Sequence, residues 1–164
     1  MSINYQFAIV TSQFNRPITD ELLRGAVARF QEYGIEQHAI TVVKVPGAIE
    51  IPLMAQHLAK QKRYHAIICL GAVIQGETDH YQYVCEQVSH GCQTVMLKFH
   101  VPIIFGVLTT HNEKEANDRI GGRKGHIGKE AVDAAIRMAS LMNEEHALND
   151  KSKWQPAQFV SAEN

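Results

Sequence analysis

The residues of this chain best suited to chemistry lie in one segment, residues 71–81. The segment follows an apolar run, residues 66–70, that predicts a strand buried on both faces, and it leads into apolar residues at helical spacing. Ligands of open α/β sheets bind beyond the carboxyl ends of the strands, and free N–H groups where a helix opens, expected here at Thr78, favour an anion such as phosphate. Gly76 lets the backbone approach a ligand, and His80 is a candidate for proton transfer because histidine exchanges protons near neutral pH. The alternative is an ordinary tight turn with a surface histidine.

A second segment of the same kind covers residues 45–52, Val-Pro-Gly-Ala-Ile-Glu-Ile-Pro. It follows the apolar strand-like residues 39–43 and again leads into a helical pattern. Glu50 falls in the expected first helical turn, where a carboxylate is favoured by the helix dipole. Taken alone, Glu50 is interpreted as a solvated acid.

Together the two segments resemble the lumazine synthase family, the 6,7-dimethyl-8-ribityllumazine synthases of riboflavin biosynthesis. The resemblance covers roughly residues 7–145, and its pieces occur in the family's order and at its spacing. The matching pieces are Phe14-Asn15, residues 45–52, residues 71–80 with Tyr81 following, residues 102–109, and Arg119-Ile120-Gly121. The glycine loop with Glu-Thr-x-His is specific in combination with Pro-Gly-Ala-x-Glu-Ile-Pro.

The resemblance implies a reaction without a redox cofactor or a metal. In it, 5-amino-6-(D-ribitylamino)uracil condenses with 3,4-dihydroxy-2-butanone 4-phosphate through an imine, phosphate and water leave, and the ring closes. The sequence agrees, since it contains no His-Glu-x-x-His run and no cysteine and histidine spacing suited to zinc.

The resemblance also implies which residues bind and react. His80 is expected to transfer protons, Phe14 to stack on the pyrimidine, and Glu50 to accept hydrogen bonds from ribityl hydroxyls. Without the resemblance, Phe14 would be interpreted as a core aromatic and Arg119 as a solvated residue. The residues expected to bind the organic substrates are Phe14, Ala48, Ile49, Glu50, Ala72, Val73, Ile74 and Phe105; those expected to bind phosphate are Gly76, Glu77, Thr78, Arg119 and Arg123.

In the family, the residues that match Phe105 and Arg119 come from the neighbouring subunit. The resemblance therefore implies a homopentamer with active sites between subunits. It leaves open a 60-subunit shell and riboflavin synthase as a partner.

The chain departs from the family pattern in three places. Ile49 stands where the family usually has an aromatic residue, and Ile127 stands where bacterial members have a lysine that helps to hold phosphate. Lys124, His126 and Lys129 are candidates to replace that lysine. The segment before the first core strand is also shorter than in members that build shells.

Composition limits the remaining possibilities. The 164 residues are 45% hydrophobic and carry a formal net charge of -1, which predicts one compact domain, residues 1–146, with a polar and flexible C-terminal tail, residues 147–164. The charge balance favours neither nucleic acid nor a membrane surface as a partner, and no apolar run is long enough to span a bilayer. The N-terminus does not resemble a signal peptide, and three cysteines without a Cys-x-x-Cys pair indicate buried thiols in a reducing compartment. We therefore expect a cytoplasmic protein.

Strands and helices are expected to alternate along the chain. This order predicts an α/β fold, a three-layer α/β/α sandwich with a four-stranded parallel sheet of flavodoxin-like type. The expected strands cover residues 7–11, 39–45, 66–72 and 101–108; the expected helices cover residues 17–33, 48–62, 79–96, 113–120 and 128–145.

Two other functions remain open at this stage. One is a binding or shell protein that keeps the fold but has lost turnover, which only Ile49 and Ile127 favour. The other is a flavodoxin-like module that binds flavin, which leaves the Pro-Gly-Ala-x-Glu-Ile-Pro segment without a role.

Overall fold

The computed structural model describes residues 4–148, and its side chains to residue 144. The predicted tail, residues 147–164, lies outside this part apart from two helical residues. The four strands, β1 (Phe7–Ser12), β2 (Ile40–Val45), β3 (Ala66–Ile74) and β4 (Ile103–Thr110), form one parallel sheet in the order β2-β1-β3-β4. The predicted four-stranded parallel sheet is confirmed.

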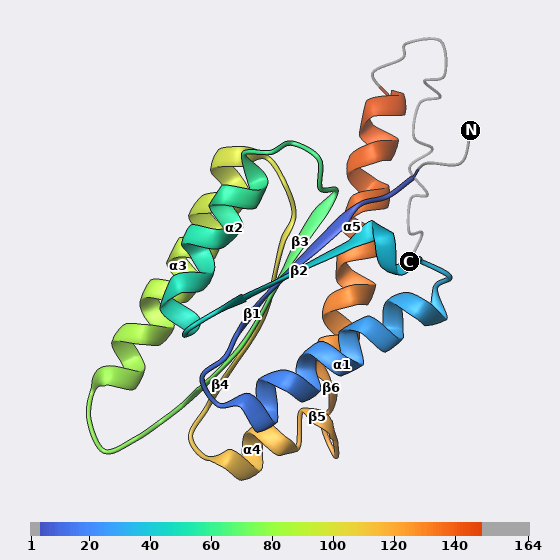
Figure 1. The fold of residues 1–164 in the computed structure, drawn as a ribbon. Helices are drawn as coiled ribbons and strands as arrows, with labels where there is room; N and C mark the ends of the chain where they lie inside the picture. Colours follow the sequence, from blue (N-terminus) through green and yellow to red (C-terminus); the bar gives the residue numbers. More distant parts are fainter. Residues whose placement is uncertain (1–3, 149–164) are drawn as a thin grey trace, which may run out of the picture.

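Helices cover both faces of the sheet. Figure 1 shows α2 (Ile51–Ala59) and α3 (His80–Phe99) on one face and α1 (Arg16–Glu32) and α5 (Ile127–Leu148) on the other, which confirms the three-layer α/β/α arrangement. The short helix α4 (Glu113–Asn117) follows β4. Gly34, directly after the predicted helix over residues 17–33, ends α1: it has a φ of 72°, in the left-handed region that glycine adopts without strain.

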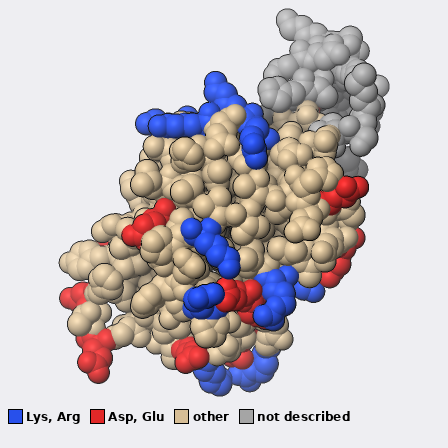
Figure 2. Space-filling model, viewed as in Figure 1, with Lys and Arg blue, Asp and Glu red and all other residues tan. Residues whose placement is uncertain are grey.

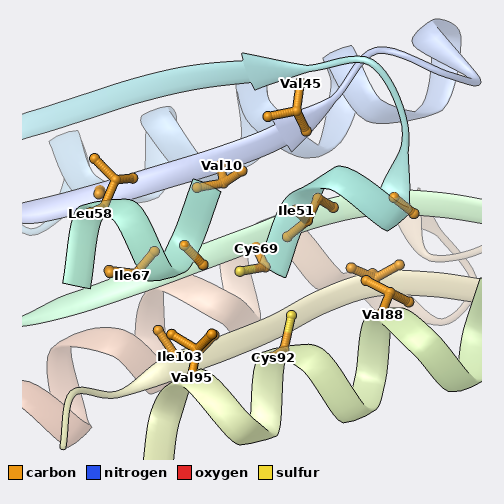
Figure 3. Close-up of a cluster of buried hydrophobic side chains, with 14 of the residues drawn as sticks. Val10, Val45, Ile51, Leu58, Ile67, Cys69, Val88, Cys92, Val95 and Ile103 are labelled. Atoms are coloured by element: carbon orange, nitrogen blue, oxygen red, sulfur yellow. The ribbon is translucent and has the colours of Figure 1, made fainter. Parts of the chain in front are cut away.

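The sheet separates two hydrophobic cores. Alternate strand residues point to opposite faces, so Ala8 and Val10 of β1 pack under α2 and α3, while Phe7 and Ile9 pack under α1 and α5. Figure 3 shows the first core, where Val10 and Cys69 from the sheet lie among side chains from α2 and α3. Because both faces are covered, the strands read as continuous apolar runs.

Several boundaries differ from the prediction. The expected helix over residues 48–62 is a 3₁₀ turn, Ala48–Glu50, followed by α2, and the third strand and helix extend further than expected. The fourth strand begins at Ile103, because Pro102 has no N–H group to donate; its carbonyl accepts from the Ile67 N–H at 2.9 Å.

The segment between α4 and α5 differs more. The expected helix over residues 113–120 ends at Asn117, and the glycine-rich residues that follow form an antiparallel hairpin of β5 (Ile120–Gly122) and β6 (Gly125–His126). Gly121 and Gly125 have φ angles of 108° and 81°, which other residues adopt only with strain. The hairpin fixes the backbone directly after Arg119.

The thiols and the surface charges complete the description. Cys69 and Cys92 are buried as expected, but Cys85 is only half-buried. Figure 2 shows lysine and arginine side chains at the upper edge of the molecule, and basic and acidic side chains next to one another in its lower part. Within the described residues, no helix is long and apolar enough to cross a membrane.

Candidate active site

The carboxyl ends of three neighbouring strands surround one cavity of about 320 Å³. The cavity lies where β1, β2 and β3 end and α3 begins, as the strand order β2-β1-β3 requires. Its lining residues are Phe14, Asn15, Gly47, Ala48, Ile49, Glu50, Ala72, Val73, Ile74, Gly76, Thr78, His80, Tyr81 and Val84. Phe14-Asn15, the segment of residues 45–52 and the segment of residues 71–81 therefore contribute to a single cavity.

Phe14 provides the aromatic surface of the cavity. The pairing of β1 with β2 continues past the strand ends, since the Gln13 N–H donates to the Val45 carbonyl at 2.8 Å and the Phe14 N–H donates to the Pro46 carbonyl at 3.0 Å. These bonds fix the backbone of Phe14 while its side chain is 71% exposed. The alternative interpretation of Phe14 as a core aromatic is wrong, and its ring is free to stack on a planar ligand.

Asn15 joins two of the strand ends. Its backbone is left-handed, with φ 59° and ψ 46°, and its side-chain Nδ2 donates to the Ala72 carbonyl at 2.9 Å. Its own carbonyl accepts from the N–H groups of Ile18 and Thr19 at the start of α1. Asn15 therefore connects the loop that carries Phe14 to the end of β3.

Glu50 lies at the rim of the cavity, within the turn that follows β2. Its Oε2 accepts from the Gly47 N–H at 2.8 Å, and this bond closes the turn. A carboxylate accepts up to four hydrogen bonds, so this contact leaves capacity for the hydroxyls of a ligand. The turn also places Ala48 and Ile49 at the cavity wall, Ala48 buried and Ile49 exposed.

The glycine loop crosses the open side of the cavity. Gly76, Thr78 and His80 are exposed and line it, whereas Glu77 is exposed outside it. A Cβ added to Gly76 would meet no atom of the chain within 4 Å, so the space over this backbone is open to a ligand. The sequence predicted that the helix opens at Thr78, but α3 begins two residues later, at His80. The His80 N–H donates to the Thr78 Oγ1 at 3.4 Å. Free N–H groups of a long helix thus lie beside the loop.

Tyr81 separates the cavity from a second, more polar pocket. That pocket is lined by Cys85 and Glu86 of α3 and by Thr109 and His111 at the end of β4. Burial raises the pKa of the Tyr81 phenol and of the Cys85 thiol, so both groups stay protonated at neutral pH. Tyr81 is therefore a neutral wall between the pockets and carries no charge toward a ligand.

Besides Glu77, three predicted site residues lie apart from the cavity. Phe105 is 42% exposed on β4, which is an edge strand. The Arg119 Nη1 donates to the Glu115 carbonyl at 2.8 Å, and the exposed Arg123 Nη2 lies 3.6 Å from the Asp118 Oδ2. The chain by itself does not bring these residues together with Phe14 and His80.

Four lining residues received no role from the sequence: Asn15, Gly47, Tyr81 and Val84. Asn15 was detectable, because asparagine after a strand and before an Arg-Pro helix start tolerates left-handed backbone. Gly47 and Val84 carry no comparable signal. Within the described residues there is also no group of three His, Cys, Asp or Glu side chains able to hold a metal ion.

Comparison with known proteins supplies the family. The profile of the family described as 6,7-dimethyl-8-ribityllumazine synthase matches residues 4–143. Relatives from Coxiella burnetii strains CbuG_Q212 and RSA 493 / Nine Mile phase I, both named 6,7-dimethyl-8-ribityllumazine synthase, are 55% identical over 141 residues, which is 86% of this chain and 93% of each relative. A relative of the same name from strain Dugway 5J108-111 has the same identity and coverage. The chain belongs to the 6,7-dimethyl-8-ribityllumazine synthase family.

Proposed function

We infer that this protein forms 6,7-dimethyl-8-ribityllumazine from 5-amino-6-(D-ribitylamino)uracil and 3,4-dihydroxy-2-butanone 4-phosphate, releasing phosphate and water. The observation that carries this inference is the single cavity that gathers Phe14, Glu50 and His80 at three strand ends. In this cavity the exposed ring of Phe14 suits a planar pyrimidine, and the carboxylate of Glu50 suits the hydroxyls of a ribityl chain. The N-terminus of α3 suits a phosphate group.

The pyrimidine and its ribityl chain occupy the part of the cavity between β1 and β2. Phe14 stacks on the ring, and backbone groups of Ala48, Ile49 and residues 72–74 hydrogen-bond its edge. Glu50 accepts from ribityl hydroxyls with the acceptor capacity that its bond to the Gly47 N–H leaves. The turn that Glu50 closes holds this carboxylate in place before the substrate arrives.

The phosphate of the second substrate lies against residues 76–78, beside the N-terminus of α3. The open space over Gly76 and the hydroxyl of Thr78 support this position. His80, the first residue of the helix, transfers protons during imine formation and phosphate elimination. A positioned proton donor or acceptor contributes about 10²–10⁴-fold, and holding the two reactants together contributes much of the rest.

A second subunit supplies the cations and the other aromatic wall. Phe105 on the open edge of the sheet, together with Arg119 and Arg123, completes the site of the next subunit in a homopentamer. The location of these three residues outside their own cavity supports a divided site. A cytoplasmic location completes the proposal, which leaves open both a 60-subunit shell and association with riboflavin synthase.

One assay tests the reaction. The purified protein is mixed with both substrates, and lumazine absorbance and phosphate release are followed together. Equal rates of the two products support the proposed condensation. Binding of the pyrimidine without either product would instead identify a binding protein that has lost turnover.

A mixing experiment tests the divided site. The variants His80→Ala and Arg119→Ala are each assayed alone and after joint refolding. Mixed rings contain some sites in which neither change is present, so they regain activity if the site lies between subunits. Two variants that remain as inactive together as apart would place both residues in one subunit's site.

A further inference from the structure

An imidazole with both nitrogens buried occupies a slot that glycines keep open between three elements. The His126 ring lies against Gly25 of α1, Gly121 of β5 and Gly128 of α5. A Cβ added to Gly25 would lie 2.0 Å from the ring Cε1, and its three nearest atoms all belong to this imidazole. At Gly128 a Cβ would meet the Leu22 carbonyl oxygen at 2.2 Å, so α1 and α5 approach closely beside the ring. These glycines leave room for one side chain.

The polar atoms of this ring are enclosed. The His126 side chain is 12% exposed, and neither ring nitrogen has a hydrogen-bond partner among the described residues. The nearest carboxylate is Glu21 of α1, whose Oε1 lies 3.8 Å from Nε2, and its other oxygen pairs with Arg24. An unpaired buried nitrogen costs free energy, so the ring stabilises this arrangement through its shape and its packing against the glycines.

The slot is connected to Arg119 through the hairpin. Ile120 pairs with His126 across β5 and β6, and the Ile127 N–H donates to the Arg119 carbonyl at 2.9 Å. The Lys124 N–H donates to the Asp118 carbonyl at 2.8 Å. The residues directly before and after β6 therefore bond to the backbone carbonyls of Asp118 and Arg119.

We propose that His126 is a positioning residue: its imidazole, seated in the glycine slot beside Glu21, docks the β5–β6 hairpin onto α1 and so orients Arg119 for the phosphate of the substrate. The last step rests on the proposed function. The docking step does not, because it concerns only contacts within one chain.

The docking step is tested by a double-mutant cycle on Gly25→Ala and His126→Ser. With the imidazole present, the new methyl group overlaps the ring and lowers the melting temperature. With serine at position 126 the methyl group has room, and alanine within a helix is more favourable than glycine, so the same change raises it. If Gly25→Ala changed the melting temperature by the same sign and size in both backgrounds, the imidazole would not fill the space beside Gly25, and the proposal would be refuted.

Amide exchange gives a second readout of docking. In His126→Ser, the Ile127 amide exchanges about tenfold faster or more, since the hairpin opens locally. The Ile67 amide, bonded to the Pro102 carbonyl at the other end of the sheet, keeps its wild-type rate. His38→Ser is the matched control, because His38 also lies beside a carboxylate, Glu36 at 3.1 Å, but is exposed. Unchanged exchange at Ile127 would contradict the proposal.

Kinetics test the orientation of Arg119. His126→Ser raises KM for the butanone phosphate, leaves KM for the pyrimidine at its wild-type value, and reduces the additional effect of Arg119→Ala. Equal increases in both KM values, or full additivity with Arg119→Ala, would refute the positioning role. If the wild-type protein forms no lumazine, the proposed function fails, while the cycle and the exchange rates still decide the docking.

Discussion

Asn15 is the residue at which a small change should most clearly separate local strain from the loss of a contact. Its backbone is left-handed, and its Nδ2 bonds to the Ala72 carbonyl at 2.9 Å. Asn15→Gly removes the bond but tolerates the backbone, so it should lower the free energy of unfolding by about 0.5–1.5 kcal/mol. Asn15→Ala adds the cost of left-handed backbone, for a total loss of about 1.5–3.5 kcal/mol.

The measurement is urea unfolding of the wild type and both variants, combined with steady-state kinetics. Because the bond joins the loop of Phe14 to the end of β3, we expect both variants to raise KM for the pyrimidine and to leave KM for the butanone phosphate nearly unchanged. Asn15→Gly and Asn15→Ala should differ in stability by the strain of left-handed alanine, partly offset by the larger backbone entropy that glycine loses on folding.

Two results would refute this reasoning. Equal or greater stability of the alanine variant would mean that left-handed backbone at position 15 costs no more than the backbone entropy that glycine loses on folding. Loss of stability without any change in KM for the pyrimidine would mean that the bond between Asn15 and Ala72 does not hold the cavity wall in its binding shape.

Further predictions concern catalysis, phosphate binding, acid stability and assembly. His80→Ala should lower turnover about tenfold or more while the pyrimidine still binds, as single-turnover kinetics and ligand titration would show. Arg119→Ala should raise KM for the butanone phosphate far more than KM for the pyrimidine, and equal increases would indicate a structural role. The hydrogen bond from Arg29 lowers the pKa of the Asp133 carboxyl, so the pair stabilises the fold above the unfolded pKa of about 3.9 and loses this contribution as pH falls through the lower folded value. The stability difference between wild type and Asp133→Asn should thus shrink on acidification, whereas a constant difference from pH 7 to pH 2 would exclude the ion pair as its cause. Light scattering should give five times the 18.4 kDa mass of one chain, or a larger multiple for a shell, and a monomer would contradict the divided site.

Much of the fold could be predicted from patterns among residues that are close together in the sequence. Continuous apolar runs predicted strands covered on both faces, and 3.6-residue periodicity predicted the helices, because both patterns depend on neighbouring residues. Gly34 was recognisable as the end of α1 for the same reason. The carboxyl-end loops of successive parallel strands were therefore expected to share one edge, and the cavity lies there.

The hairpin after Arg119 was predicted less well. Its strands, Ile120–Gly122 and Gly125–His126, are too short to show alternation, so the sequence indicated only a glycine-rich turn. The positive φ angles of Gly121 and Gly125, and the antiparallel pairing between them, become visible only in the folded backbone.

The sequence alone determined the element order, the segments that carry chemistry and the resemblance to a family, because each is written in residues that lie close together along the chain. The tertiary structure alone decided which of those residues share a cavity. The bond from Asn15 to Ala72 and the contact of Gly25 with His126 join residues far apart in sequence, and they depend on strand order and helix packing. Phe105 lies on an edge strand, away from the cavity of its own chain, and nothing in the local pattern of β4 distinguishes such a residue from one that faces it.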